Sequence, residues 1–231
     1  MADELSAMIA AVSDASLPTL RAVVFDLDGV IRHWNDDELD AVEAACGLPP
    51  RTILDIAFDD ELGPGAMTGR LTYREWMDEI RRRVLSTHGS TATDALDAWE
   101  CNVGLVDPDA VALVRRVRSW FAVALLSNGT TRLRRDLHVL GIDDEFDQVF
   151  NTAELGVAKP AAEVYGIVCE RLGLDAGEVA FVDDLEVNVH GARDAGLHAT
   201  VHLDLTTTTA FLEGLGLPAG SGERRPSAST R

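Results

Sequence analysis

Short apolar runs that end in acidic or turn-forming residues recur along the chain. Five of them have the length of buried strands, at residues 22–25, 121–126, 148–151, 179–182 and 198–203. The later runs are separated by stretches with apolar residues at helical spacing, several of which end at a glycine. Strands that alternate with helices predict a parallel sheet covered by helices on both faces.

The segment from about residue 35 to 102 differs, because it carries helical signals and no convincing strand. Helices are predicted at 36–46, 51–58, 72–85 and 91–99. Gly63-Pro64-Gly65 and Gly69 predict a loop rather than a helix. Thr72 and Glu75 have the spacing of a capping box, which marks the start of the third of these helices.

The long interval between the first two strands indicates an insertion. Because connections between strands of a compact domain are normally short, roughly 90 residues here predict an inserted helical subdomain that lies over the end of the first strand. We expect a leader at 1–18, a core formed by 19–34 and 104–218, a helical cap at 35–103 and a disordered tail at 219–231.

Charge and composition restrict the partners. The net charge of −19 argues against nucleic acid and anionic lipid surfaces. No apolar run approaches the roughly 18 residues that cross a bilayer, and acidic Asp3 and Glu4 do not fit a secretion signal. Three widely spaced cysteines, Cys46, Cys101 and Cys169, fit a reducing cytoplasm. The oligomeric state, monomer or homodimer, cannot be predicted.

Two carboxylates follow the first strand directly. Asp26 and Asp28 lie one residue apart and therefore point to the same side of an extended chain. Ligands of open α/β sheets bind outside the carboxyl ends of the strands. Two carboxylates that close require a neutralising cation, and oxygen ligands suit Mg²⁺. A simple turn, which Asp and Gly also favour, is the alternative.

Three other polar groups follow later strands. Ser127-Asn128-Gly129 offers a hydroxyl and backbone N–H groups to a phosphate, or forms an ordinary turn. Asp183-Asp184 completes an Mg²⁺ site or caps the next helix. Lys159 neutralises a phosphoryl group or lies in solvent. The expectation that all of them meet at one edge of the sheet favours the functional alternatives. The six histidines lack the spacing of a zinc site.

These motifs resemble, in order and spacing, the four motifs of the haloacid dehalogenase-like hydrolase superfamily. They are Phe25 to Val30, Ser127-Asn128-Gly129, Lys159-Pro160 and Val182-Asp183-Asp184. The resemblance covers about residues 21 to 205. It implies a Rossmann-like three-layer α/β/α core with strand order 5-4-1-2-3 and a helical cap of the first type. Residues 154–160 and 183–188 look like the dehalogenase and sugar-phosphatase branches.

The resemblance also implies catalytic roles. Asp26 would be the nucleophile that forms an aspartyl-phosphate, and Asp28 the general acid and base. The Mg²⁺ ligands would be the carboxylates of Asp26 and Asp183 and the backbone carbonyl of Asp28.

Phosphate binding is implied for a second group of residues. Ser127 and the N–H of Asn128 would hold the transferring phosphoryl group, while Lys159 neutralises its charge. Asp184 would act through a water molecule or orient Lys159, and Asn188 would support this loop.

Asp28 separates the branches of the superfamily. Dehalogenases typically lack an aspartate at this position, because a leaving halide needs no proton. We therefore predict an Mg²⁺-dependent phosphatase of a small phosphorylated metabolite, for which a sugar phosphate is one candidate. A phosphomutase, a haloalkanoate dehalogenase and a non-catalytic phospho-ligand-binding protein are the alternatives. Arg32, His33 and Trp34 are unusual after the first motif, and Arg32 or His33 is expected to add positive charge at the mouth of the site.

Overall fold

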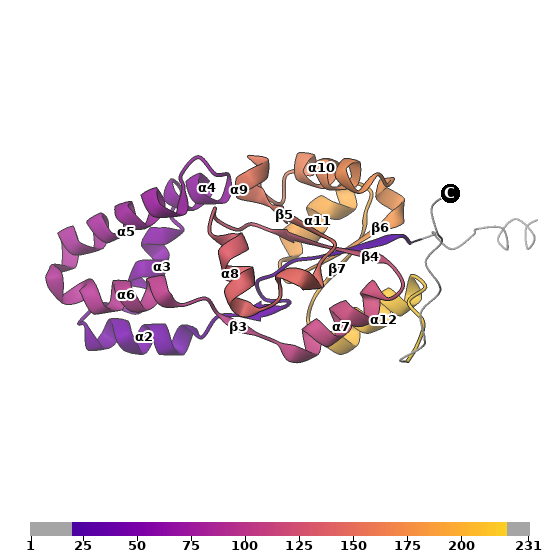
Figure 1. The fold of residues 1–231 in the computed structure, drawn as a ribbon. Helices are drawn as coiled ribbons and strands as arrows, with labels where there is room; N and C mark the ends of the chain where they lie inside the picture. Colours follow the sequence, from indigo (N-terminus) through magenta and orange to yellow (C-terminus); the bar gives the residue numbers. More distant parts are fainter. Residues whose placement is uncertain (1–19, 221–231) are drawn as a thin grey trace, which may run out of the picture.

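The computed structural model describes residues 20–220. The leader predicted at 1–18 and most of the tail predicted at 219–231 lie outside this range. A sheet with helices on both faces forms one part of the molecule, and a group of helices inserted after the first strand forms the other (Figure 1). These correspond to the α/β fold with a helical insertion that the sequence predicts.

The central sheet has five parallel strands in the order β5-β4-β1-β6-β7. When the five predicted strands are numbered along the chain and the sheet is read from β7 to β5, the order is 5-4-1-2-3, which confirms the expected fold. The strands are β1 (Ala22–Phe25), β4 (Ala122–Ser127), β5 (Gln148–Asn151), β6 (Val179–Asp183) and β7 (His198–Val201).

Helices cover both faces of the sheet because its central strands are apolar throughout. In β1, Val23 and Phe25 pack on one face and Ala22 and Val24 on the other. The first face is covered by α7 (Pro108–Arg118), α8 (Leu133–Leu140) and α12 (Leu205–Gly214). The second face is covered by α10 (Ala162–Leu172) and α11 (Glu186–Asp194). Single turns of 3₁₀ helix lie at Ser90–Ala92, Asp143–Glu145 and Ala176–Glu178.

The inserted helices form a subdomain with its own apolar core, which we call the cap. They are α2 (Asp36–Ala45), α3 (Thr52–Ala57), α4 (Leu62–Met67), α5 (Tyr73–His88) and α6 (Thr93–Cys101). Trp76 of α5 lies at the centre of this core and donates a hydrogen bond of 2.9 Å from Nε1 to the carbonyl of Ala57. Within residues 20–220, no helix is both long and apolar enough to cross a membrane.

The prediction of a loop at Gly63-Pro64-Gly65 is wrong, because these residues form α4. The Asp59 carboxylate accepts hydrogen bonds from the backbone N–H groups of Glu61 and Leu62, at 2.9 and 2.7 Å, and so caps the helix. Pro64 lies in the first turn, where its missing N–H is not needed. Gly65 packs against Leu71, where a Cβ would lie 2.9 Å from a methyl carbon.

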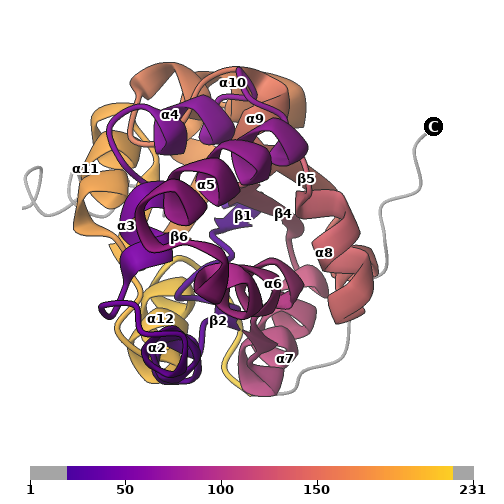
Figure 2. The same ribbon diagram turned by 90° about the vertical axis from the view of Figure 1, so that its left-hand side faces the viewer.

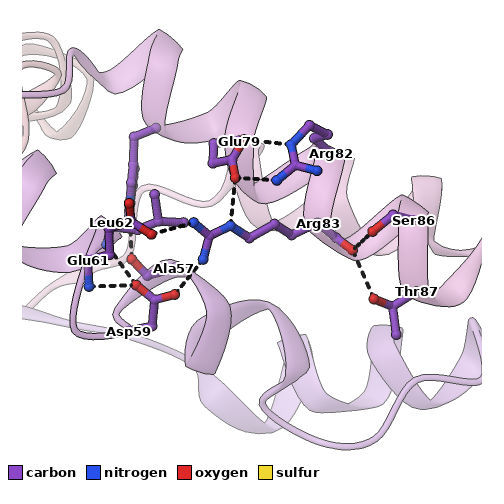
Figure 3. Close-up of polar contacts among 10 residues, drawn as sticks. Ala57, Asp59, Glu61, Leu62, Glu79, Arg82, Arg83, Ser86 and Thr87 are labelled. Carbon is purple, nitrogen blue, oxygen red and sulfur yellow. Dashed lines mark hydrogen bonds and ion pairs between the residues drawn. The ribbon is translucent and has the colours of Figure 1, made fainter.

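Arg83 of α5 fixes the start of α4 (Figure 3). Its guanidinium contacts carboxylate oxygens of Asp59 at 2.6 Å, Glu61 at 2.9 Å and Glu79 at 2.7 Å. Glu79 also accepts two hydrogen bonds from Arg82. These hydrogen bonds from Arg82 and Arg83 hold the pKa of Glu79 at about 2. The network joins α5 to the start of α4.

Three short elements were not predicted at all. β2 (Arg32–His33) and β3 (Leu105–Val106) form an antiparallel pair where the chain enters and leaves the cap. The turn α9 (Thr152–Leu155) follows β5 directly. Strands of two residues and a single helical turn of four residues are too short for a periodic pattern of apolar side chains to develop. The β2–β3 pair joins the two chain crossings at the base of the cap.

Candidate active site

The carboxyl ends of β1, β4 and β6 meet below the cap. Figure 2 looks from the cap side, with α5 and α6 in front of these strands. Asp26 follows β1 and extends its pairing with β6, because its N–H donates to the carbonyl of Val182 at 2.8 Å. Ser127 ends β4 and Asp183 ends β6. Sheet register thus brings residues about 100 and 160 positions apart to one edge.

Lys159 lies between two of these carboxylates. Its Nζ is 2.7 Å from Asp26 Oδ1, 2.7 Å from Asp183 Oδ2, and 3.1 Å from the carbonyl oxygen of Leu126. The side chain is only 1% exposed. Burial alone would lower the pKa of Lys159, but the attraction of Asp26 and Asp183 outweighs burial and raises it above its ordinary value. The ammonium therefore stays charged.

The loop after β4 supports Lys159 and faces the site. The Asn128 carboxamide accepts from the N–H of Lys159 at 2.9 Å and donates to its carbonyl at 3.1 Å. This places the side chain of Asn128 on Lys159, so only its backbone N–H stays a predicted phosphate ligand. Ser127 Oγ is buried and has no hydrogen-bond partner among residues 20–220. A buried hydroxyl without a partner is rare, and it fits a binding site in which a ligand oxygen accepts the hydrogen bond.

Three carboxylates gather at the centre of the site. Oxygens of Asp26, Asp183 and Asp184 lie within 4.8 Å of one another. Burial raises the pKa of Asp26 to about 7, with Lys159 opposing and Asp183 adding to the rise. Burial and the charge of Asp183 also raise the pKa of Asp184. Closely spaced hard oxygen donors whose repulsion one lysine only partly relieves fit a divalent cation such as Mg²⁺.

Asp183 is held in a single orientation. It is fully buried and accepts hydrogen bonds from the Asn188 carboxamide at 3.0 and 3.2 Å and from the N–H of Leu185 at 2.9 Å. Asp184 packs against Gly29, where a Cβ would lie 2.2 Å from Asp184 Oδ2. The glycine after the first motif is therefore needed for close approach as well as for its positive φ of 78°.

Asp28 lies apart from this carboxylate cluster. Its carboxylate receives two hydrogen bonds from Arg32, at 2.7 Å from Nε and 3.0 Å from Nη2, and one of 2.8 Å from Trp34 Nε1. The expected positive charge of Arg32 at the mouth of the site is not free, because the side chain is buried and paired with Asp28. The four-residue spacing of Asp28 and Arg32 was the available signal. His33 is exposed.

The cap contacts the core beside the site. Thr131 Oγ1 accepts a hydrogen bond of 2.8 Å from the N–H of Tyr73, the first residue of α5. Gly69 lies against the carbonyl of Ala153, where a Cβ would be 2.0 Å from the oxygen. None of these contact residues carries a motif that reveals its position from sequence.

Comparisons with known proteins agree with this geometry. The profile of the haloacid dehalogenase-like hydrolase family matches residues 20–196. Phosphatase MT3486 of Mycobacterium tuberculosis is 30% identical over 225 residues, which cover 86% of this chain and 99% of that protein. Bifunctional epoxide hydrolase 2 of Sus scrofa is 26% identical over 84% of this chain, which spans only 38% of that relative's length.

Solved structures share the fold. A haloacid dehalogenase family enzyme from Bacteroides thetaiotaomicron, in complex with magnesium and inorganic phosphate, superimposes with a TM-score of 0.67 at 21% identity, covering 82% of this chain and 98% of that one. L-2-haloacid dehalogenase from Xanthobacter autotrophicus, with chloropropionic acid covalently bound, gives a TM-score of 0.59 at 25% identity, with 86% and 84% of the two chains covered.

Proposed function

Because this chain belongs to the haloacid dehalogenase-like hydrolases, we propose that it is an Mg²⁺-dependent phosphatase of a small phosphorylated metabolite. One observation carries the proposal: buried Asp26 lies against Lys159 within a cluster of further carboxylates, and Asp28 follows two residues later. The full-length similarity to a phosphatase of Mycobacterium tuberculosis supports the same reaction.

Asp26 and Asp28 divide the chemistry between them. A carboxylate oxygen of Asp26 attacks phosphorus, and the bond to the alcohol oxygen breaks as Asp28 gives that oxygen its proton. Water then attacks the phosphorus of the aspartyl-phosphate. Asp28 takes the proton of this water, phosphate leaves, and Asp26 is again a carboxylate. Asp28 is returned to its starting protonation state by this second step.

The remaining residues bind and orient. Asp26, Asp183 and Asp184 would hold Mg²⁺ together with the carbonyl of Asp28. The bound cation would supply positive charge beside the phosphoryl oxygens. Lys159 adds a second fixed cation next to the nucleophile, and Ser127 Oγ is free to donate to a phosphoryl oxygen. Asn128 fixes the backbone of Lys159 and so the reach of its ammonium.

A phosphate-release assay tests the proposal. The panel should contain p-nitrophenyl phosphate, sugar phosphates, nucleotides and phosphoglycolate, each with Mg²⁺ and with EDTA. We expect Mg²⁺-dependent release that Asp26→Asn abolishes, because an amide is not a nucleophile for phosphorus. Robust turnover by Asp26→Asn would contradict the role of Asp26.

Three further readouts separate the alternatives. Conversion of a sugar phosphate to its isomer without free phosphate would indicate a phosphomutase. Halide release from 2-chloropropionate would indicate a dehalogenase, against the presence of Asp28 in this chain. Binding of phosphate esters without any turnover would indicate a phospho-ligand-binding protein.

A further inference from the structure

The contacts of Asp28 bear on its role as acid and base. A carboxylate that transfers protons has to be directed at the leaving oxygen, and two planar hydrogen bonds from one guanidinium fix both the position and the plane of a carboxylate. Arg32 makes this bidentate contact with Asp28, and the Trp34 indole adds a third donor. The Asp28 side chain is 39% exposed, so these three hydrogen bonds, rather than tight packing, fix its orientation.

Arg32 is itself held rigidly. Its side chain is 5% exposed, and the guanidinium carbon lies 4.4 Å from the centre of the Trp34 ring. Gly104, directly before β3, packs against the aliphatic part of Arg32, where a Cβ would lie 2.8 and 2.9 Å from Cγ and Cδ. Arg32 also belongs to β2, which pairs with β3 at the base of the cap.

A line of alternating charges continues from Arg32 into the core and the cap. Arg32 Nη1 makes no hydrogen bond within residues 20–220 and lies 3.9 Å from the buried carboxylate of Asp136 in α8. Asp136 accepts from Arg132 Nε at 2.9 and 3.0 Å. Arg132 then donates to the carbonyls of Glu100, at 2.8 Å, and Asn102, at 3.1 Å, at the end of the cap.

Arg132 also contacts Tyr73, the first residue of the cap helix α5. The guanidinium carbon of Arg132 lies 4.3 Å from the centre of the Tyr73 ring, and Nη1 also contacts the Tyr73 hydroxyl. Arg132 and Asp136 have side chains 10% and 9% exposed. Separation of such a pair would leave an uncompensated charge in the interior, which is strongly destabilising, so these buried side chains are held in a fixed geometry.

We infer that Arg32 is a positioning residue for Asp28, and that Asp136 and Arg132 register it against the cap. The inference rests on the proposed function, because it concerns proton transfer by Asp28. Arg32 touches neither substrate nor metal in this account; it acts only through the carboxylate that it holds. Positioning contacts of this kind contribute about 10- to 100-fold to activity.

The test uses the dependence of rate on the leaving group. The value of kcat/KM reports the step in which the alcohol departs. An alkyl alcohol needs a proton at that step, whereas p-nitrophenolate hardly does. Wild type, Arg32→Lys and Trp34→Phe should be compared on β-glycerol phosphate and p-nitrophenyl phosphate. Arg115→Lys is the matched control, since it breaks a bidentate pair with Glu145 near the opposite edge of the sheet.

We expect Arg32→Lys to lower kcat/KM for β-glycerol phosphate about 10- to 100-fold, and that for p-nitrophenyl phosphate by no more than about threefold. Lysine keeps the charge but not the two parallel hydrogen bonds. Trp34→Phe, at a partly exposed position, should shift the ratio of the two values in the same direction by less. Arg115→Lys should leave this ratio unchanged.

Two results would overturn the inference. An equal fall in kcat/KM for both substrates would show that Arg32 only supports the fold, and kcat/KM values that both stay at the wild-type level would show that it does not act on Asp28. Wild-type protein that releases no phosphate from either ester would contradict the proposed function itself, and the inference with it. The ratio therefore tests the role of Arg32, whereas the wild-type rate tests the proposed phosphatase activity, and a failure of one can be told from a failure of the other.

Discussion

Lys159 sets the charge balance of the site, and it is the only lysine in the 231-residue sequence. Its ammonium lies 2.7 Å from two carboxylates that are themselves buried. Removal of one partner from such an arrangement leaves uncompensated charge in the interior, which typically costs several kcal/mol. The ammonium is thus a structural counter-charge for Asp26 and Asp183, and in the proposed reaction it is also a cation beside the phosphorus.

A single lysine allows a direct measurement of this charge. In protein labelled with ¹³Cε-lysine and kept free of Mg²⁺, we expect one lysine resonance. Because the pKa of Lys159 is raised above its usual value, the proton is retained, and the resonance should stay at its ammonium position up to about pH 10. Asp183→Asn should shift its titration to lower pH. Deprotonation of wild type well below pH 10 would contradict the proposed ion pairs.

Phosphate binding by the Ser127 hydroxyl can be tested by mutation. Its buried hydroxyl has no partner to lose within the described chain, so Ser127→Ala should leave the thermal midpoint nearly unchanged. A hydrogen bond to a charged phosphoryl oxygen contributes about 1.5–3 kcal/mol, which corresponds to a fall of about 10- to 100-fold in kcat/KM. Ser119→Ala, which removes a hydroxyl bonded to its own helix, is the control. Unaltered kinetics of Ser127→Ala would contradict phosphate binding by this hydroxyl.

The positions of site residues were predictable where strand ends fix them. Asp26 follows β1, Ser127 ends β4 and Asp183 ends β6, and parallel register alone brings them to one edge. The partners of Asp28 were not predictable, because they depend on the turn through Gly29, where the N–H of Gly29 donates to the carbonyl of Arg32 at 2.8 Å. Sequence spacing gives proximity along the chain but not the direction of a side chain.

The length of a helix or strand determines how well the sequence predicts it. Strands with a continuous apolar run and helices with several turns were found close to their expected bounds. The α4 helix was missed because glycine and proline normally break helices, whereas here Asp59 caps the first turn and Leu71 needs the space beside Gly65. Tertiary packing therefore overrides local preference in this part of the cap.

Contact between the cap and the core can be tested at one glycine. Gly69 has φ +69° and lies against the carbonyl of Ala153, whereas Gly89 has φ +73° and open space around it. Gly69→Ala and Gly89→Ala should each lose about 1–3 kcal/mol of stability through backbone strain. Only Gly69→Ala should also raise KM, because the added methyl forces the cap away from α9. Equal kinetics of the two variants would show that this contact does not matter for substrate binding.

The whole molecule carries a charge of −19, which opposes an anionic substrate. The site's own cation is buried between two carboxylates, and Arg32 is paired with Asp28. Both of these cations are thus already paired with carboxylates, and in the proposed reaction the bound metal ion would supply most of the local attraction.

Salt should consequently assist the reaction. Screening weakens the repulsion between the protein and a phosphate ester, so kcat/KM at saturating Mg²⁺ should rise, by up to about tenfold, between low ionic strength and about 0.15 M NaCl. The comparison should be made with p-nitrophenyl phosphate, at fixed pH. A fall in kcat/KM over the same range would show instead that local positive charge governs the encounter.

In the proposed reaction, Asp26 carries a phosphoryl group during turnover. Protein mixed with p-nitrophenyl phosphate and Mg²⁺, quenched in acid and digested, should show the mass of one phosphoryl group on the peptide that contains Asp26. The modification should be absent with EDTA and in Asp26→Asn. Rapid turnover with no phosphorylated peptide, or with the phosphoryl group on another residue, would contradict the account.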